Sequence, residues 1–155
     1  MNFTLNGRTL KYEDEKIYIM IEKYYRSYKK GDWKEMTFLK DRNGYLYIPI
    51  GSKKYKIHRL LGYLFLGLNI EDTTQKIDHI NRIKDDNRIE NLRIVTTQQN
   101  GFNRGAKGYY FNKKQNKFQS GIYLNSKHIY LGLFDTEEEA HQAYLDAKQK
   151  YHLIE

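Results

Sequence analysis

The chain contains no cysteine, and this absence restricts how so short a sequence can fold. Disulfides and cysteine-ligated zinc, which often hold small modules together, are excluded. The 155 residues must therefore be stabilised by packing, with a modest hydrophobic core in each module. The 15 Tyr and 7 Phe offer large areas for burial, and tyrosine hydroxyls can remain in water at the edge of a core.

The charge balance indicates a polyanionic partner. Lys and Arg together number 27 against 19 Asp and Glu, which gives a formal net charge of +8 and favours nucleic acid or an anionic membrane. No apolar run approaches the roughly 18 residues of a membrane span, and no signal peptide is visible. We therefore expect a cytoplasmic, intracellular protein that binds nucleic acid and not a membrane.

An adjacent acid and imidazole, Asp78-His79, are followed along the chain by the carboxamides of Asn91 and Asn100. Hydrolysis of a phosphodiester needs a water that gives up a proton and a cation beside the phosphate. Histidine is largely neutral near pH 7 and accepts a proton, while Asp and Asn oxygens are the hard ligands that Mg²⁺ prefers. Taken alone, the Asp-His pair also fits an ordinary solvated turn.

The surrounding residues predict a compact unit around this pair. Residues 76–80 have the pattern of a strand end, 81–88 that of a polar loop, and 91–96 that of a second, β-branched strand. Thr96 or Thr97 is placed to cap a helix that begins just before Asn100. In the resulting order of strand, loop, strand and helix, the side chains of Asp78, His79 and Asn100 can converge on one face.

These residues resemble a known motif. Residues 78–81, 87–96 and 99–100 are similar to the HNH motif of the ββα-metal nucleases, in the variant whose third position is Asn. Residues 56–67 resemble the segment that leads into this motif in HNH homing endonucleases of mobile introns and phages. The resemblance covers roughly residues 41–104.

The resemblance implies a role for each residue. His79 would be the general base, Asp78 and Asn100 the metal ligands, and Asn91 would brace the loop that orients the imidazole. Because Asn100 replaces His at the third position with a neutral, hard oxygen, Mg²⁺ or Mn²⁺ is favoured over Zn²⁺. No structural zinc is expected.

The C-terminal third has a separate pattern. Between Lys107 and Phe134 there is no Asp or Glu, whereas five lysines occur there: Lys107, Lys113, Lys114, Lys117 and Lys127. Alternation predicts two strands joined at Asn125-Ser126, with these apolar residues on one face: Phe118, Ile122, Leu124, Ile129, Leu131 and Leu133. The opposite face would carry Gln119, Tyr123, His128 and Tyr130 between the lysines, a surface suited to polyanions.

A helix is predicted to cover the apolar face. Thr136 and Glu139 form a capping box, and five of the following residues lie at helical spacing, Ala140, Ala143, Tyr144, Ala147 and Tyr151. Residues 107–144 look like an apetala-type DNA-binding domain, in which the exposed sheet face enters the major groove. By this resemblance the contacting positions are Lys107, Tyr110, Asn112, Tyr123, His128 and Tyr130. Since Tyr, His or Asn fill several positions where that family has Arg, the base preference does not carry over.

The first 40 residues are harder to interpret. Residues 17–21 fit either a strand or the start of a helix through Tyr24, Tyr25 and Tyr28. Residues 44–50 and 53–57 indicate two strands joined at Gly51-Ser52. His58 would then open a helix with an apolar side made of Leu60, Leu61, Leu64, Phe65 and Leu68.

Together these patterns predict an α+β fold in three parts. Residues 1–40 form a small β-rich N-terminal region of unclear role, 41–104 a ββα-metal HNH nuclease core, and 105–155 a three-stranded antiparallel sheet packed on one C-terminal helix. The predicted function is a metal-dependent, site-specific DNA endonuclease of the HNH homing type. It would cut double-stranded DNA to leave 5′-phosphate ends, as a monomer or a homodimer.

Two other functions stay open. A DNA-binding regulator with an inactive nuclease scaffold would use the same lysine-rich sheet without metal, but a decayed site would be expected to have lost at least one of its four residues. An RNA nuclease or RNA binder is disfavoured because the deep, narrow major groove of RNA does not admit a sheet.

Overall fold

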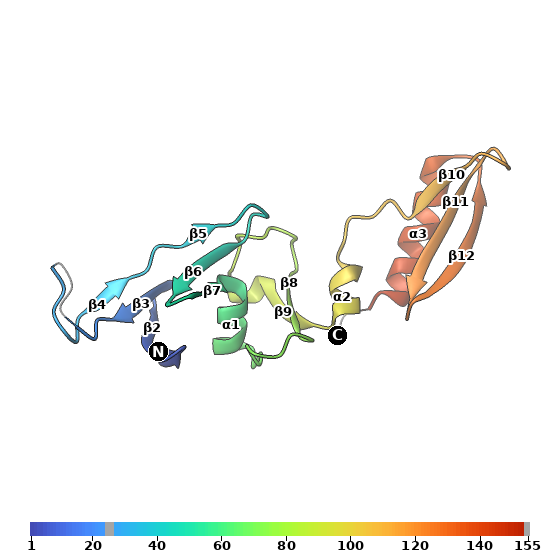
Figure 1. The fold of residues 1–155 in the computed structure, drawn as a ribbon. Coiled ribbons are helices and arrows are strands. Elements are labelled where there is room, and N and C mark those ends of the chain that lie inside the picture. Colours follow the sequence, from blue (N-terminus) through green and yellow to red (C-terminus); the bar gives the residue numbers. More distant parts are fainter. Residues whose placement is uncertain (24–26, 154–155) are drawn as a thin grey trace. The chain divides into compact units, whose positions relative to one another are not determined.

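The computed structural model describes residues 1–23 and 27–153 and has a mixed α+β fold of small helices and several antiparallel sheets (Figure 1). The described residues fall into two compact units. The first unit comprises those of Met1–Ile70 and Ile83–Leu92. The second comprises Glu71–Arg82 and the described residues from Arg93 onward. The α+β prediction is therefore confirmed at this level.

The first unit begins with a four-stranded antiparallel sheet. Its strands follow the chain order, β1 (Asn2–Leu5), β2 (Arg8–Glu13), β3 (Lys16–Met20) and β4 (Trp33–Glu35). Leu10 and Ile17 are completely buried on one face of this sheet. The strand interpretation of residues 17–21 is thus correct for Ile17–Met20, and the helical one is wrong there. Tyr24 and Tyr25, through which that helix would have run, lie outside the described residues.

A second sheet and a short helix complete the core of the first unit. The strands are β5 (Leu39–Lys40), β6 (Leu46–Ile50) and β7 (Lys53–Lys56), and α1 (Ile57–Phe65) follows directly. Helix α1 ends earlier than its apolar pattern suggests because Gly67 adopts a positive φ of 78° and the Leu68 amide returns to the Gly62 carbonyl. Leu68 is still buried, as part of the turn that ends the helix.

The segment that holds the predicted nuclease motif forms short elements. Strands β8 (Lys76–His79) and β9 (Leu92–Val95) make a two-stranded sheet, the 3₁₀ turn η1 (Ile89–Asn91) precedes β9, and α2 (Thr97–Phe102) contacts β8. Thr96 caps α2 in a capping box, with its hydroxyl accepting the Gln99 amide and the Gln99 side chain accepting the Thr96 amide. These elements match the predicted order of strand, loop, strand and helix.

The C-terminal part of the second unit is a sheet covered by one helix (Figure 1). Strands β10 (Tyr109–Asn112), β11 (Lys117–Leu124) and β12 (Lys127–Phe134) are antiparallel in that order, and α3 (Glu137–Tyr151) packs on them. The core is built on Ile122, Tyr144 and Ala147. The predicted turn is present, with positive φ at Asn125 and Ser126, and Thr136 and Glu139 form the predicted capping box.

One detail of this sheet differs from the alternating pattern. A β-bulge shifts the register, so that Gly121 pairs with Tyr130 while Ser120 pairs with Gly132. Leu131 is the extra residue, and beyond it Leu133 lies opposite Gln119. Because directly paired residues share a face, the expectation that Leu133 lies with Ile129 on the helix-covered face is wrong.

Candidate active site

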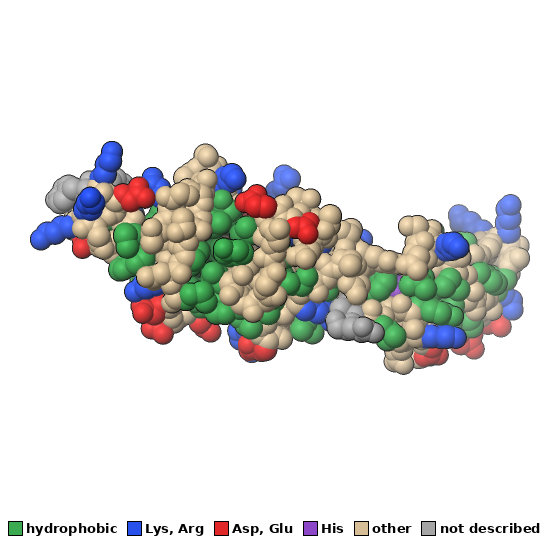
Figure 2. All heavy atoms as spheres, turned by 90° about the horizontal axis from the view of Figure 1, so that it is seen from below, with side chains coloured by type: hydrophobic (Ala, Val, Ile, Leu, Met, Phe, Trp, Pro, Cys, Tyr) green, Lys and Arg blue, Asp and Glu red, His purple; other side chains and the backbone are tan. Residues whose placement is uncertain are grey.

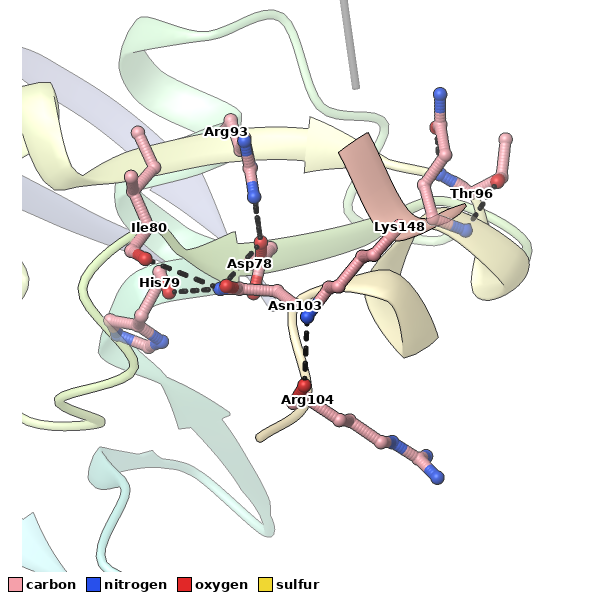
Figure 3. Close-up of polar contacts among 9 residues, drawn as sticks. Asp78, His79, Ile80, Arg93, Thr96, Asn103, Arg104 and Lys148 are labelled. Carbon is pink, nitrogen blue, oxygen red and sulfur yellow. Dashed lines mark hydrogen bonds and ion pairs between the residues drawn. The ribbon is translucent and has the colours of Figure 1, made fainter. Parts of the chain in front are cut away.

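The carboxylate of Asp78 is held by two neighbours (Figure 3). Asp78 lies on β8 and is buried. From β9, Arg93 donates to its Oδ2 through Nε at 3.0 Å and Nη2 at 2.8 Å. Asn103 donates Nδ2 to both carboxylate oxygens at 3.1 Å. The negative charge of Asp78 is therefore compensated, and its orientation is fixed from two sides.

Asn103 is a residue of the site that sequence reasoning missed. It caps the C-terminus of α2, and besides Asp78 its amide contacts the His79 carbonyl at 2.8 Å and the Ile80 carbonyl at 3.3 Å. Residues 100–106 contain two glycines and few apolar residues, a composition typical of a short joint between modules, and nothing in their spacing points back to β8. Only the contact of α2 with β8 reveals the connection.

His79 occupies the last position of β8 and is only 4% exposed. Successive strand residues project to opposite faces, and the imidazole points away from the carboxylate of Asp78 (Figure 3). The sequence does not predict this burial. A general base must contact the attacking water. His79 can therefore act as the base only if its imidazole becomes accessible to water.

The two carboxamides have different surroundings. Asn91, in η1, is buried and donates Nδ2 to the Asp86 carbonyl at 2.7 Å, so it braces the end of the loop between β8 and β9. Because Asn91 belongs to the first unit and His79 to the second, its influence on the imidazole stays a prediction. Asn100 is half-buried on α2, and no described residue forms a hydrogen bond with its carboxamide.

The donor set fits a metal that keeps much of its own water shell. Within residues 1–23 and 27–153 there is no cluster of three or more His, Cys, Asp or Glu side chains of the kind that encloses a metal. Mg²⁺ needs only one or two carboxylates besides water and phosphate. Asp78 Oδ1 accepts a single bond, from Asn103, and so retains a free lone pair, whereas Oδ2 accepts three. Asp78 Oδ1 thus remains available as a ligand atom, and Asn100, the second predicted ligand, lies on α2, which contacts β8.

The predicted DNA-binding side chains lie on the second unit, and most are exposed. Tyr110, Tyr123 and Tyr130 are 57%, 65% and 55% exposed, large fractions for aromatic side chains. The rings of Tyr123 and His128 lie 4.9 Å apart. Gly121 makes room for the imidazole, since a Cβ there would come within 2.2 Å of His128 Nε2. The absence of a Cβ at Gly121 thus allows the His128 ring to lie across this face of the sheet.

Some of the remaining candidates for DNA binding have a hydrogen-bond or ion-pair partner, and others have no carboxylate partner in the described part of the chain. Asn112 donates Nδ2 to Gln119 Oε1 at 2.9 Å, so these two amides hold one another. Lys117 forms an ion pair with Asp135 at 2.9 Å. No carboxylate among the described residues pairs with Lys107, Lys114 or Lys127. In Figure 2 acidic side chains gather along one edge of this module, and Lys and Arg project mostly from the opposite edge.

Replacement of Asn103 by alanine should lower the free energy of unfolding by about 1–3 kcal/mol, because a buried carboxylate and two carbonyls each lose a hydrogen bond. Denaturant titration measures this loss. The matched control is Asn100→Ala in the adjacent helix, where no side-chain bond is lost and the change should stay within about 0.5 kcal/mol. Equal losses of unfolding free energy in both variants would show that the hydrogen bonds of Asn103 do not stabilise the fold.

One family model matches the segment that contains this site. Residues 55–102 match the family model described as HNH endonuclease. The matched range contains Asp78, His79, Asn91 and Asn100, and stops one residue before Asn103. No solved structure matches the chain significantly. Along the described residues no helix has the length and apolar character needed to cross a membrane. The family match supports an HNH nuclease acting on DNA.

Proposed function

We propose that the chain is a metal-dependent, site-specific DNA endonuclease of the HNH homing type. In this proposal β8, β9 and α2 form the ββα-metal unit within residues 41–104. Residues 105–155 form an apetala-type DNA-binding domain. The enzyme hydrolyses one phosphodiester per site and leaves a 5′ phosphate.

One observation carries the proposal: the HNH endonuclease match at residues 55–102 includes all four side chains that the chemistry requires. Two of them, Asp78 and His79, are adjacent on β8, and Asn100 follows on α2, which contacts β8. Asn91 is buried and braces the intervening loop. Each retained residue has a hydrolytic role, which a scaffold without activity would not need.

In the mechanism, His79 takes the proton from the water that attacks phosphorus. Asp78 and Asn100 would hold a Mg²⁺ or Mn²⁺ ion, which would supply charge stabilisation for the phosphate and for the leaving 3′ oxygen. Arg93 and Asn103 act on Asp78 and not on the substrate: their bonds fix its carboxylate and leave Oδ1 as the ligand atom.

The exposed face of β10–β12 supports the binding half of the proposal. Its tyrosines are accessible to bases and sugars, and three lysines of the same part of the chain, Lys107, Lys114 and Lys127, lack a carboxylate partner among the described residues. Such lysines neutralise backbone phosphates and release counterions. We propose that this face lies in the major groove, as in the domain it resembles, and tethers the nuclease unit near its cleavage site.

The rival function, a DNA-binding regulator with an inactive nuclease scaffold, is favoured by two features of the same site. His79 is buried, and Asp78 is ion-paired with Arg93. Both features are compatible with a site that has become purely structural. They are also compatible with a free enzyme whose base becomes accessible on binding DNA, since catalytic geometry is often completed only in the complex.

Metal-dependent cleavage separates these two functions. The protein is incubated with a library of supercoiled plasmids that carry fragments of the encoding genome, in Mg²⁺ or in EDTA. Nicked or linear product in Mg²⁺ alone supports the endonuclease, and sequencing the product ends gives the strand, the position and the 5′ phosphate. Retention of plasmid in a binding assay without any cleavage, in Mg²⁺ and also in Mn²⁺, would support the regulator.

Replacement of Asn100 by alanine tests the metal ligand. Because the carboxamide makes no other bond among the described residues, its loss should raise the Mg²⁺ concentration for half-maximal cleavage by about tenfold or more, with unfolding unchanged. The measurement is cleavage rate against Mg²⁺ concentration. An unchanged Mg²⁺ dependence would remove Asn100 from the site.

A further inference from the structure

A hollow of about 410 Å³ lies in the second unit beside the candidate active site, and two residues of its lining, Arg82 and Lys148, have no part in the roles described above. Three segments line it: the turn after β8 at Arg82, residues 103–107 after α2, and one side of α3. Asn103, which holds the carboxylate of Asp78, is also a lining residue. The side chain of Asn103 therefore links the hollow to Asp78, the proposed metal ligand.

The lining is strongly positive. It includes Arg82, Arg104, Lys107 and Lys148 and no acidic residue. None of these four cations forms an ion pair with a carboxylate of the described residues. Burial, and then the nearby charge of Arg82, lowers the pKa of Lys148 below its ordinary value. Like charges are thus crowded together without a counter-charge, an arrangement that an anion would relieve.

Contacts with the backbone of residues 104–107 hold the lining of the hollow together. Lys148 donates Nζ to the Arg104 carbonyl at 3.0 Å, which leaves further ammonium protons for a ligand (Figure 3). His141 donates Nδ1 to the Lys107 carbonyl at 2.7 Å. Gly105 lets the Arg82 guanidinium approach closely, because a Cβ there would lie 3.1 Å from Nη1. Arg82 and Lys148 therefore face the hollow from two elements tied to the same short segment.

We propose that this hollow binds a backbone phosphate of the DNA, adjacent to the one that is cut, with Arg82 and Lys148 as its principal ligands. The identification of the anion as DNA rests on the proposed function. The site would fix the register between the strand being cut and the sheet β10–β12, because its ligands come from both the β8 turn and α3. Phosphate contacts of this kind position a protein on DNA without reading its sequence.

The salt dependence of DNA binding tests the site. Affinity for a mixed-sequence duplex is measured in EDTA, so that no cleavage occurs, over a range of salt concentrations. Lys148→Gln and, separately, Arg82→Gln should each reduce the slope of log Kobs against log salt by up to about 0.9, the value for one lost phosphate contact. Lys150→Gln removes the same charge from the same helix outside the hollow and should leave the slope unchanged.

A charge-preserving variant separates binding from folding. Lys148→Arg keeps the cation and should retain the wild-type slope, even though the bond to Arg104 is altered. The phosphate site is refuted if Lys148→Gln and Lys150→Gln have the same salt-dependence slope. It is also refuted if Lys148→Arg reduces that slope as much as Lys148→Gln does.

A second probe keeps the hollow testable if the proposed function fails. Inorganic tripolyphosphate is titrated into the labelled protein without DNA, and amide shifts are followed by NMR. Shifts concentrated at residues 104–107 and lost in Lys148→Gln support the site, whereas shifts confined to the lysines of β10–β12 refute it. If the wild-type protein binds no duplex, DNA binding is refuted. The tripolyphosphate titration alone would then show whether the hollow binds phosphate.

Discussion

Replacement of His79 by alanine should abolish DNA cleavage while DNA affinity stays nearly unchanged. A positioned general base contributes about 10²–10⁴-fold to such a reaction, and no other described histidine lies on β8 or α2 to replace it. Affinity comes instead from the phosphate and groove contacts of other residues. Single-turnover cleavage in Mg²⁺ and duplex binding in EDTA measure the two properties separately.

Because His79 is buried, its replacement also leaves a cavity, and lost activity must be distinguished from lost folding. His58→Ala is the matched control, since His58 is a buried histidine of α1 with no assigned part in the chemistry. Both variants should lose stability, but only His79→Ala should lose cleavage when assayed well below its unfolding temperature. Parallel loss of cleavage and affinity in His79→Ala would refute the base assignment.

The secondary structure around the site was predictable because its signals are local. Alternation located β11 and β12, and the capping residues Thr96 and Thr136 located the starts of α2 and α3. The errors arise where one residue changes the geometry. The bulge at Leu131 reverses the faces of the residues after it, and no alternating pattern contains that information. Gly67 ends α1 although apolar residues continue the helical spacing to Leu68.

The site itself was only partly predictable. The types of Asp78, His79, Asn91 and Asn100 indicate a chemistry, and their spacing indicates a motif. The partners of Asp78 depend instead on strand pairing and on where α2 ends. Arg93 reaches Asp78 because β9 lies beside β8, and Asn103 does so because α2 returns the chain to β8. The basic hollow likewise joins residues from three segments that are distant in sequence.

Replacement of Gly108 by alanine should destabilise the sheet and helix of the C-terminal part by about 2–5 kcal/mol. Gly108 has a positive φ of 76°, which costs an L-residue about 1–2 kcal/mol. A Cβ at this position would lie 1.9 Å from Tyr144 Cγ and 2.5 Å from Tyr144 Cβ. Rotation of the tyrosine side chain cannot move its own Cβ, so backbone must shift, at a further cost of about 1–3 kcal/mol.

The shift would also weaken the start of the sheet, because the Gly108 carbonyl accepts both the Gly121 amide at 3.0 Å and the Ser120 hydroxyl at 3.2 Å. Denaturant unfolding is followed by the fluorescence of Trp33, which reports on the first unit, and by NMR signals of Ile122 and Ala147 in the core of the second. The control is Gly101→Ala, on helix α2 with no atom within 4 Å of the new methyl group, which should be neutral or slightly stabilising. If Gly108→Ala unfolds at the same denaturant concentration as this control, the packing of Gly108 against Tyr144 is wrong, and so is the position of α3 that holds Lys148 over the basic hollow.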